Sequence, residues 1–302
     1  GVNFFDTADV YSSGISESML GKALGSKRKD VVIATKGEGR MGNGPNDEGH
    51  SRQHLIKACE DSLKRLNTDY IDLYQVHSFD FITPLDEMML ALDQLVKDGK
   101  VRYIGISNFF AWQIMKLMSI SEIQNLNKII SLQAYYSLVG RDLEYEIIPV
   151  CLDQKIGIIV WSPLHGGILS GKYRKGKKWP RGTRIKAEGQ HFTYDIKKGE
   201  EILSLMENIS TERNTTMSQV ALNYSLQKPG ITSVIIGARN EKQLVENIKT
   251  ADWKLTENEM KKLDEISEPP RIYPHWYFDV FKKSRMERYF SILARQEVKD
   301  GV

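Results

Sequence analysis

The sequence is poor in cysteine, in long apolar runs and in excess charge of either sign. Its 302 residues contain two cysteines, far apart, which excludes a disulfide framework and indicates a reducing compartment. No apolar run approaches the ~20 residues that a bilayer span requires. The formal net charge is only +3, which argues against a dedicated nucleic-acid surface. We therefore expect a soluble, cytoplasmic protein that binds small molecules, with no nucleic-acid or membrane partner.

The chain alternates between short strand-like segments and amphipathic segments of helical period. This alternation predicts repeated βα units around a parallel sheet. Arg52–Leu66 is typical of the helices, since apolar residues recur at helical spacing behind the expected N-cap Ser51. Other expected helices are Leu85–Lys97, Gly199–Arg213, Ser218–Leu226 and Lys242–Ala251. The expected strands are Val2–Asp6, Val31–Lys36, Tyr70–His77, Val101–Ser107, Ile129–Gln133, Ile158–Trp161 and Ser233–Ile236.

Polar residues follow the expected strands at the points where the strands end. Asp6, Lys36 and His77 each end a strand, and Tyr11 lies in the loop just beyond Asp6. In a parallel barrel such strand ends share one face, so these side chains are expected to converge. Each has an alternative structural role: a half-buried aromatic for Tyr11, a core histidine for His77, or a local strand cap. A lysine at the end of an apolar strand, however, requires a paired anion.

These segments resemble the active-site motifs of the aldo-keto reductases. The resemblance rests on NFFDTADVY at residues 3–11, VIATK at 32–36 and YIDLYQVH at 70–77, and it continues through GISN at 105–108, WSPL at 161–164 and GAR at 237–239. It covers the chain to about residue 265. It implies an α/β fold, the (β/α)8 TIM barrel, and a chemistry of carbonyl reduction with NADPH.

The chemistry of such a reduction explains why these residue types are needed. A hydride must come from a nicotinamide, and a proton donor must face the carbonyl oxygen as negative charge develops there. A phenol with a pKa near ~10 is a poor acid at neutral pH, but a nearby ammonium favours its ionised form. The predicted catalytic group is therefore Tyr11 as general acid, Lys36 as the ammonium that makes the phenol more acidic and Asp6 as the partner of the lysine. His77 would orient the substrate oxygen.

The resemblance also implies a set of residues that hold the cofactor. Ser107, Asn108 and Gln133 are similar to the groups that bind the nicotinamide carboxamide, and Trp161 has the place of the stacking aromatic. Strand-end capping is the alternative. The loop that follows contains Ser162, Pro163, Leu164, Gly167 and Lys172, where glycine permits close backbone approach and the lysine is expected to meet a pyrophosphate. A simple glycine-rich turn is the alternative there.

A segment near the C-terminus is expected to select NADP over NAD. Gly237 and Arg239 lead from a strand into a helix that contains Gln243, Glu246 and Asn247. A helix N-terminus favours anions, and the Arg239 guanidinium can donate paired, charge-assisted hydrogen bonds to the 2′-phosphate of the adenosine. Arg184 is a further candidate in an irregular loop, where a solvated surface position is equally compatible with the sequence.

Two other patterns are rejected as sites. Residues 37–42 satisfy GxGxxG after a strand, but the following Asn43-Gly44-Pro45-Asn46 cannot open the helix that a dinucleotide fingerprint needs, so we expect a loop. His50 and His54 have the spacing of a metal pair but lack a clear third ligand. We therefore expect no metal site.

The sequence departs from the family pattern at both ends. Aldo-keto reductases have a further strand and helix before the motif that begins at Gly1, and we expect these to be a missing N-terminal segment, because an open barrel would expose a sheet edge. We expect one barrel domain over 1–302, with a tail at 266–302 near the substrate mouth. The aromatic residues of the tail are compatible with a substrate-pocket wall, a packing helix or a homo-oligomer contact.

The expected function is reversible hydride transfer between NADPH and an aldehyde or ketone. The alternative is an NADPH-binding regulatory subunit with little turnover, because the potassium-channel β-subunits resemble the sequence through the same motifs. The presence of all four catalytic residue types favours the enzyme.

Overall fold

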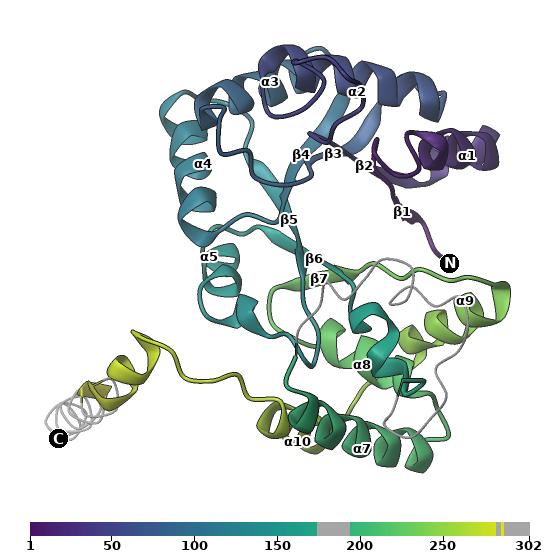
Figure 1. The fold of residues 1–302 in the computed structure, drawn as a ribbon, viewed down its shortest axis with the longest axis vertical. Helices are drawn as coiled ribbons and strands as arrows, with labels where there is room; N and C mark the ends of the chain where they lie inside the picture. The colour runs from purple at the N-terminus through teal and green to yellow at the C-terminus, as the bar shows by residue number, and fades with distance from the viewer. Residues whose placement is uncertain (174–193, 282–284, 287–302) are drawn as a thin grey trace, which may run out of the picture. The chain divides into compact units, whose positions relative to one another are not determined.

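The computed structural model describes residues 1–173, 194–281 and 285–286. The chain divides into two compact units, residues 1–267 and residues 268–302. The first contains a seven-stranded sheet and the helices around it (Figure 1). The second includes a helical segment at residues 275–281, in which Trp276 and Tyr277 contact each other and also Tyr273 just before the segment. A single barrel domain with a tail at the substrate mouth stays a prediction.

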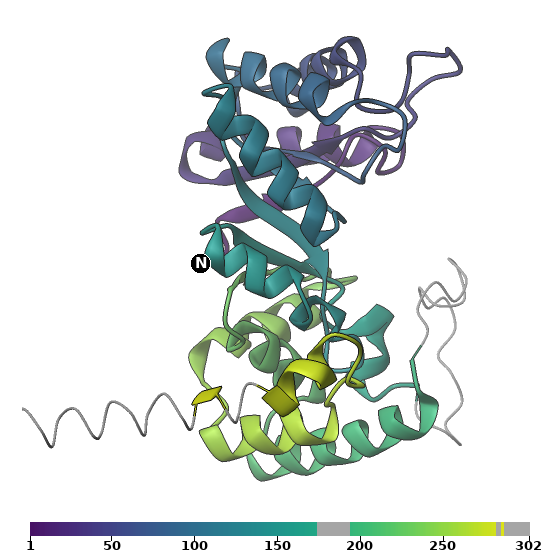
Figure 2. The same ribbon diagram turned by 90° about the vertical axis from the view of Figure 1, so that its left-hand side faces the viewer.

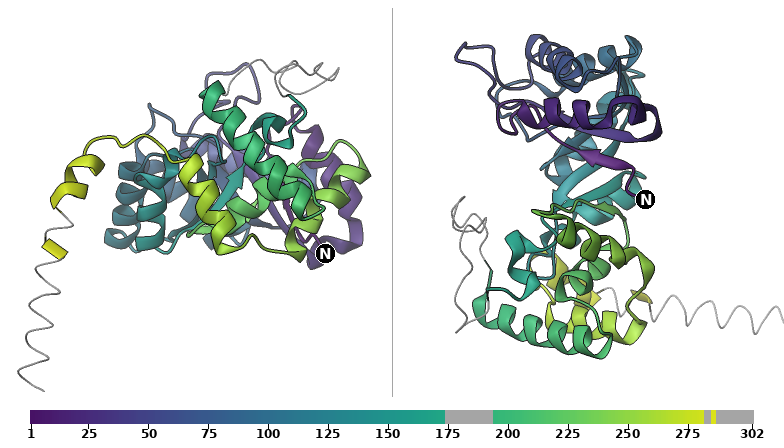
Figure 3. Two further views of the ribbon diagram at one scale, coloured as in Figure 1. Left: turned by 90° about the horizontal axis from the view of Figure 1, so that it is seen from below. Right: turned by 90° about the vertical axis from the view of Figure 1, so that its right-hand side faces the viewer.

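The seven strands are parallel and follow one another across the sheet in chain order. They are β1 (Phe4–Asp6), β2 (Val32–Gly37), β3 (Ile71–Val76), β4 (Val101–Ser107), β5 (Ile129–Tyr135), β6 (Gly157–Trp161) and β7 (Ile231–Val234). Each pairs in parallel with the next, so β1 and β7 are the two edges, and β1 is seen at one edge in Figure 3. The parallel α/β class is confirmed. Within the described ranges no pairing joins β7 to β1, and the missing first strand stays a prediction.

Helices follow most strands and cover the sheet. They are α1 (Ile15–Leu24), α2 (Arg52–Leu66), α3 (Leu85–Lys97), α4 (Ala111–Ile123), α5 (Ile147–Asp153), α7 (Ile196–Glu212), α8 (Met217–Leu226), α9 (Glu241–Ile248) and α10 (Glu257–Ile266). Figure 2 shows α4 and α5 in front of the strands that they cover. Ser51 caps α2 as expected, accepting a hydrogen bond from the His54 backbone N–H at 3.2 Å. In the part of the chain that the structure describes, no helix is long and apolar enough to cross a membrane.

Most expected boundaries are close to the observed ones, and the exceptions have local causes. Helices α2 and α3 match the predictions residue for residue. Helix α7 begins three residues early because the Asp195 carboxylate accepts from the Lys198 N–H and so starts the helix at Ile196. Strand β7 lies two residues earlier than predicted. Helices α1, α4, α5 and α10 were not singled out from the sequence. In α4 the reason is that Trp112, Met115 and other apolar side chains also occupy its exposed face and hide the helical period.

The two faces of the sheet carry different kinds of side chain. The outer face packs against the helices in one large apolar core. On the inner face Ala34, Leu73 and Ile159 form a small apolar cluster, with Phe4 packed against it. Because side chains alternate along a strand, the residues two positions further along point to the same face. Phe4 is followed by Asp6, Ala34 by Lys36 and Leu73 by Gln75, so an apolar layer lies below a polar one.

Candidate active site

The polar layer at the strand ends is centred on a buried ion pair. The Lys36 side chain is fully buried, and its Nζ donates to Asp6 Oδ2 at 2.5 Å and to the Thr7 carbonyl oxygen at 2.8 Å. The other carboxylate oxygen, Asp6 Oδ1, accepts from Gln133 Nε2 at 2.7 Å and from Gln75 Nε2 at 3.3 Å. Four strands thus contribute to one network. An ammonium this deeply buried requires such partners, and all its protons face oxygen atoms once Tyr11 is included.

Tyr11 is the third partner of the lysine. Lys36 Nζ lies 3.4 Å from Tyr11 Oη, at the long end of hydrogen bonding, and 5.0 Å from the centre of the ring. The tyrosine residue is 40% exposed, so one side of it faces the buried charge and another faces solvent. The structure therefore brings the predicted acid, amine and phenol together, with the phenol outermost.

His77 completes the predicted group. Its ring lies edge-on to that of Tyr11, with centroids 5.7 Å apart and an interplanar angle of 75°. Burial, followed by the Lys36 ammonium, lowers the pKa of His77 from 6.5 to about 4. The imidazole is therefore neutral at physiological pH. A neutral imidazole beside a phenol can donate one hydrogen bond to a substrate oxygen without adding a second positive charge to the site.

The residues predicted to bind the nicotinamide lie beside this group. Asn108, at a left-handed φ of 61°, donates from Nδ2 to the His77 carbonyl at 3.0 Å and to Ser107 Oγ at 3.1 Å. Trp161 donates from its indole N–H to Asn108 Oδ1 at 3.0 Å, which fixes the indole relative to β4. Gln133 occupies its expected strand end, but its amide donates to Asp6. In this structure Gln133 therefore supports the predicted catalytic group, through a contact that the sequence did not predict.

The loop after β6 has the backbone that its glycines predict. Ser162, Gly166 and Gly167 have positive φ angles, and a Cβ built on Gly167 would lie 2.8 Å from Lys172 Nζ. The Gly167 N–H donates to the Leu164 carbonyl at 2.9 Å and so closes a turn directly after Pro163. An ammonium thus lies directly against a backbone that only glycine can adopt without strain.

The last predicted group surrounds the start of α9. The Asn240 side chain accepts from the Gln243 N–H at 3.0 Å and caps the helix, while Gln243 Oε1 accepts from the Arg239 N–H at 3.0 Å. A Cβ at Gly237 would meet open space. Glu246 contributes its carbonyl to Gln219, and Asn247 is buried. Arg184 lies outside the described residues.

The two rejected patterns are occupied in other ways. Residues 38–51 form a loop between β2 and α2, which confirms the interpretation of the GxGxxG segment. The His50 ring bonds to the Ser78 carbonyl at 2.8 Å, and burial lowers the pKa of both His50 and His54. Of the side chains that the structure describes, no three His, Cys, Asp or Glu residues gather as a metal site requires.

Three contributions were missed by sequence reasoning. Gln75 was not singled out, although it lies two residues before His77 on the inward face, the one signal that could have found it. Asp9 and Glu17 are fully buried carboxyl groups near Tyr11. Burial raises the pKa of Asp9 to about 7, and its Oδ2 has no hydrogen-bond partner. Asp9 lies within the NFFDTADVY motif but was given no role, and Glu17 was passed over because an acidic residue in the first turn of a helix is ordinarily solvated.

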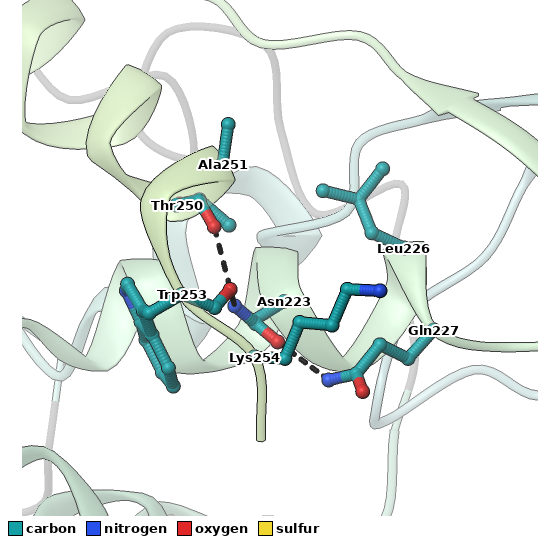
Figure 4. A pocket seen from close by; sticks show the side chains of 7 residues that line it. All are labelled: Asn223, Leu226, Gln227, Thr250, Ala251, Trp253 and Lys254. Carbon is teal, nitrogen blue, oxygen red and sulfur yellow. Dashed lines mark hydrogen bonds between the residues drawn. The ribbon is translucent and has the colours of Figure 1, made fainter.

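A separate pocket of about 360 Å³ lies at α8 and the short 3₁₀ segment Lys249–Asp252 (Figure 4). Figure 4 shows Asn223 in its wall, where the amide nitrogen donates to the carbonyl oxygens of Thr250 and Trp253 at 3.2 Å and 2.6 Å. None of the predicted site residues lines it. The polar groups of its wall mainly satisfy one another, which indicates a structural role.

Comparison with known proteins identifies the family. The family model described as "Aldo/keto reductase family" matches residues 1–268. The chain is 37% identical over 278 residues to a putative voltage-gated potassium channel subunit beta of Schizosaccharomyces pombe, covering 88% of this chain and 80% of that protein. It is 36% identical over 281 residues to an uncharacterized oxidoreductase of Bacillus subtilis, covering 89% and 84%. It is 34% identical over 294 residues to the versiconal hemiacetal acetate reductase of Aspergillus parasiticus, covering 91% and 85%. The chain therefore belongs to the aldo/keto reductase family of oxidoreductases.

Proposed function

We propose that this protein is an NADPH-dependent carbonyl reductase that interconverts an aldehyde or ketone with the corresponding alcohol. The observation that carries the proposal is the position of the Lys36 ammonium, which is fully buried between the Asp6 carboxylate and the Tyr11 oxygen. A purely structural lysine would need the carboxylate but not the partly exposed phenol. The arrangement therefore favours a phenol that delivers a proton at the carboxyl ends of the strands.

The roles of the side chains follow from charge. When bound, NADPH supplies a hydride for the carbonyl carbon, which leaves negative charge on the substrate oxygen. Tyr11 donates its proton to that oxygen, and the Lys36 ammonium stabilises the phenolate that results. Asp6 balances the charge of the lysine and holds it in place through one contact at 2.5 Å. His77, neutral because of its lowered pKa, donates a hydrogen bond to the same oxygen and orients it.

The residues present fit a dinucleotide phosphate. Trp161 offers an aromatic face that Asn108 holds in place, and the same Asn108 amide bonds the His77 carbonyl. The Ser107 hydroxyl accepts from Asn108 and keeps a proton that a carboxamide oxygen can accept, whereas Asn108 would have to leave these partners to bind the carboxamide itself. At Gly167 the backbone and the Lys172 ammonium make a close approach that suits a pyrophosphate. The capped start of α9 favours an anion, and Arg239 immediately before it suits a 2′-phosphate.

The test is NADPH oxidation with a panel of aldehydes and ketones, using the native chain and Tyr11→Phe. Phenylalanine keeps the ring against Lys36 and His77 but removes the acidic proton, so kcat should fall by about 10²–10⁴-fold while NADPH binding is retained. Tyr103→Phe is the matched control, because Tyr103 is an exposed tyrosine within β4 and should leave kcat unchanged.

The alternative function has a different outcome in the same experiment. If the native chain binds NADPH tightly but turns over no carbonyl compound, the result would favour an NADPH-binding regulatory subunit over an enzyme. Some relatives carry channel-subunit names and others reductase names, so their names do not decide between the two. Absence of NADPH binding would overturn both.

A further inference from the structure

A second buried ion pair lies behind the catalytic group, on the outer face of β2. Glu17, in the first turn of α1, is fully buried, and its Oε2 accepts from Arg65 Nε of α2 at 2.6 Å. Its other oxygen, Oε1, accepts from Thr35 Oγ1 of β2 at 2.5 Å. Arg65 is anchored further by Ser62 Oγ at 3.1 Å. One carboxylate therefore joins α1, α2 and β2, and the roles already assigned in the catalytic site do not use it.

The segment that carries Tyr11 needs such an anchor. Three consecutive residues between Tyr11 and α1, namely Ser12, Ser13 and Gly14, have positive φ angles of 50°, 53° and 90°. Non-glycine residues adopt this conformation rarely, and it persists only where the surrounding structure holds it. Gly14 is also the N-cap of α1 and has no side chain to cap the helix. Backbone turn hydrogen bonds, such as that from the Ser13 N–H to the Val10 carbonyl at 3.1 Å, hold the segment locally, and contacts from other elements must add to them.

The ion pair is connected to both ends of the Tyr11–Lys36 contact. Thr35, which binds Glu17, directly precedes Lys36, so the two side chains point to opposite faces of β2. Arg65 packs so closely on the Tyr11 segment that a Cβ at Gly14 would lie 2.6 Å from its Cδ. A change in the ion pair would thus displace the phenol relative to the ammonium.

We propose that Glu17 and Arg65 are positioning residues that hold Tyr11 within reach of Lys36. The 3.4 Å between Lys36 Nζ and Tyr11 Oη leaves little tolerance, since the contact weakens steeply at longer distances. This inference rests on the proposed function for its kinetic consequence, but its geometric content is independent of it.

The kinetic test is a double-mutant cycle between Arg65→Met and Tyr11→Phe. Arg65→Met should lower kcat by about 10- to 100-fold, the cost of a misplaced catalytic group, with KM for NADPH changed less than about twofold. In the Tyr11→Phe background it should have no further effect, because the phenol that it positions is already absent. Arg65→Lys, which keeps a cation beside Glu17, should recover part of kcat.

The matched control is Arg213→Met. Arg213 forms a similar pair with Glu259, at 2.6 Å and 2.5 Å, between α7 and α10. It should lower the unfolding temperature but leave kcat unchanged, which separates a loss of stability from a loss of positioning. If Arg65→Met does not fold, Arg65→Lys is used in the cycle.

The structural test is a crystal structure of the Arg65 variant. The Tyr11 oxygen should have moved away from the Lys36 nitrogen, and an unchanged separation of 3.4 Å would overturn the proposal whether or not the native chain turns over carbonyls. Equal kcat losses in the native and Tyr11→Phe backgrounds would also overturn it. A native chain without turnover contradicts the proposed function instead.

Discussion

The buried Lys36–Asp6 pair allows stability and activity to be separated in one mutant cycle. The Lys36 side chain is fully buried and the Asp6 side chain is 6% exposed. Lys36→Met would leave the carboxylate with only the two neutral amides of Gln75 and Gln133, and Asp6→Asn would leave the ammonium without its anion. Breaking a buried pair on one side costs about 3–5 kcal/mol, so each single variant should lose that much unfolding free energy.

The double variant should behave differently. With both charges removed no uncompensated ion remains, and replacing a buried pair by neutral groups is often close to neutral in stability. We expect the double variant to be more stable than either single one, with a coupling free energy of roughly 3 kcal/mol or more. Its kcat should nevertheless stay about 10²–10⁴-fold below that of the native chain, because no ammonium remains beside Tyr11.

The assay is urea unfolding at neutral pH, followed by circular dichroism, together with steady-state NADPH oxidation on the same samples. Lys57→Met serves as a control, since the Lys57–Asp61 pair is exposed and should change stability by less than about 0.5 kcal/mol. Losses in the two single variants that simply add in the double one would refute the pairing argument. Recovery of kcat in the double variant would refute the role of the lysine.

Three further predictions concern charge. The folded pKa of His77, about 4, lies below the ordinary 6.5, so the free energy of unfolding should fall as pH drops from 6.5 to about 4. His77→Gln should flatten this part of the acid-unfolding curve, and an unchanged curve would contradict the burial argument. The folded pKa of Asp9, about 7, lies above the ordinary 3.8, so stability should be lost as pH rises from about 4 to about 7. Asp9→Asn should raise the unfolding temperature at pH 8, and a lower unfolding temperature would contradict the burial of this carboxyl group. Arg239→Ala should raise KM for NADPH by about 10-fold or more and leave KM for NADH unchanged, whereas equal effects would remove the 2′-phosphate assignment.

Local features of the fold were accessible from sequence because their causes are local. Helix α2 begins behind Ser51 since the serine oxygen meets an N–H three residues later, and the same kind of short-range bond starts α9 at Asn240. The order of the strands followed from periodicity, and so did helices α2, α3, α7, α8 and α9. Helices α1, α4, α5 and α10 were not singled out, and in α4 the exposed face is also apolar.

The sequence by itself determined which residue types stand at the strand ends, since the alternation of side chains and the strand boundaries are properties of neighbouring residues. Tertiary structure decided which of them touch. Gln133 reaches Asp6 across 127 positions of the chain, and Glu17 reaches Arg65 across 48. Such contacts depend on the curl and register of the sheet and on helix packing, and so does the burial that lowers the pKa of His77 and raises that of Asp9. No short segment contains that information, because burial is created by residues distant in the chain.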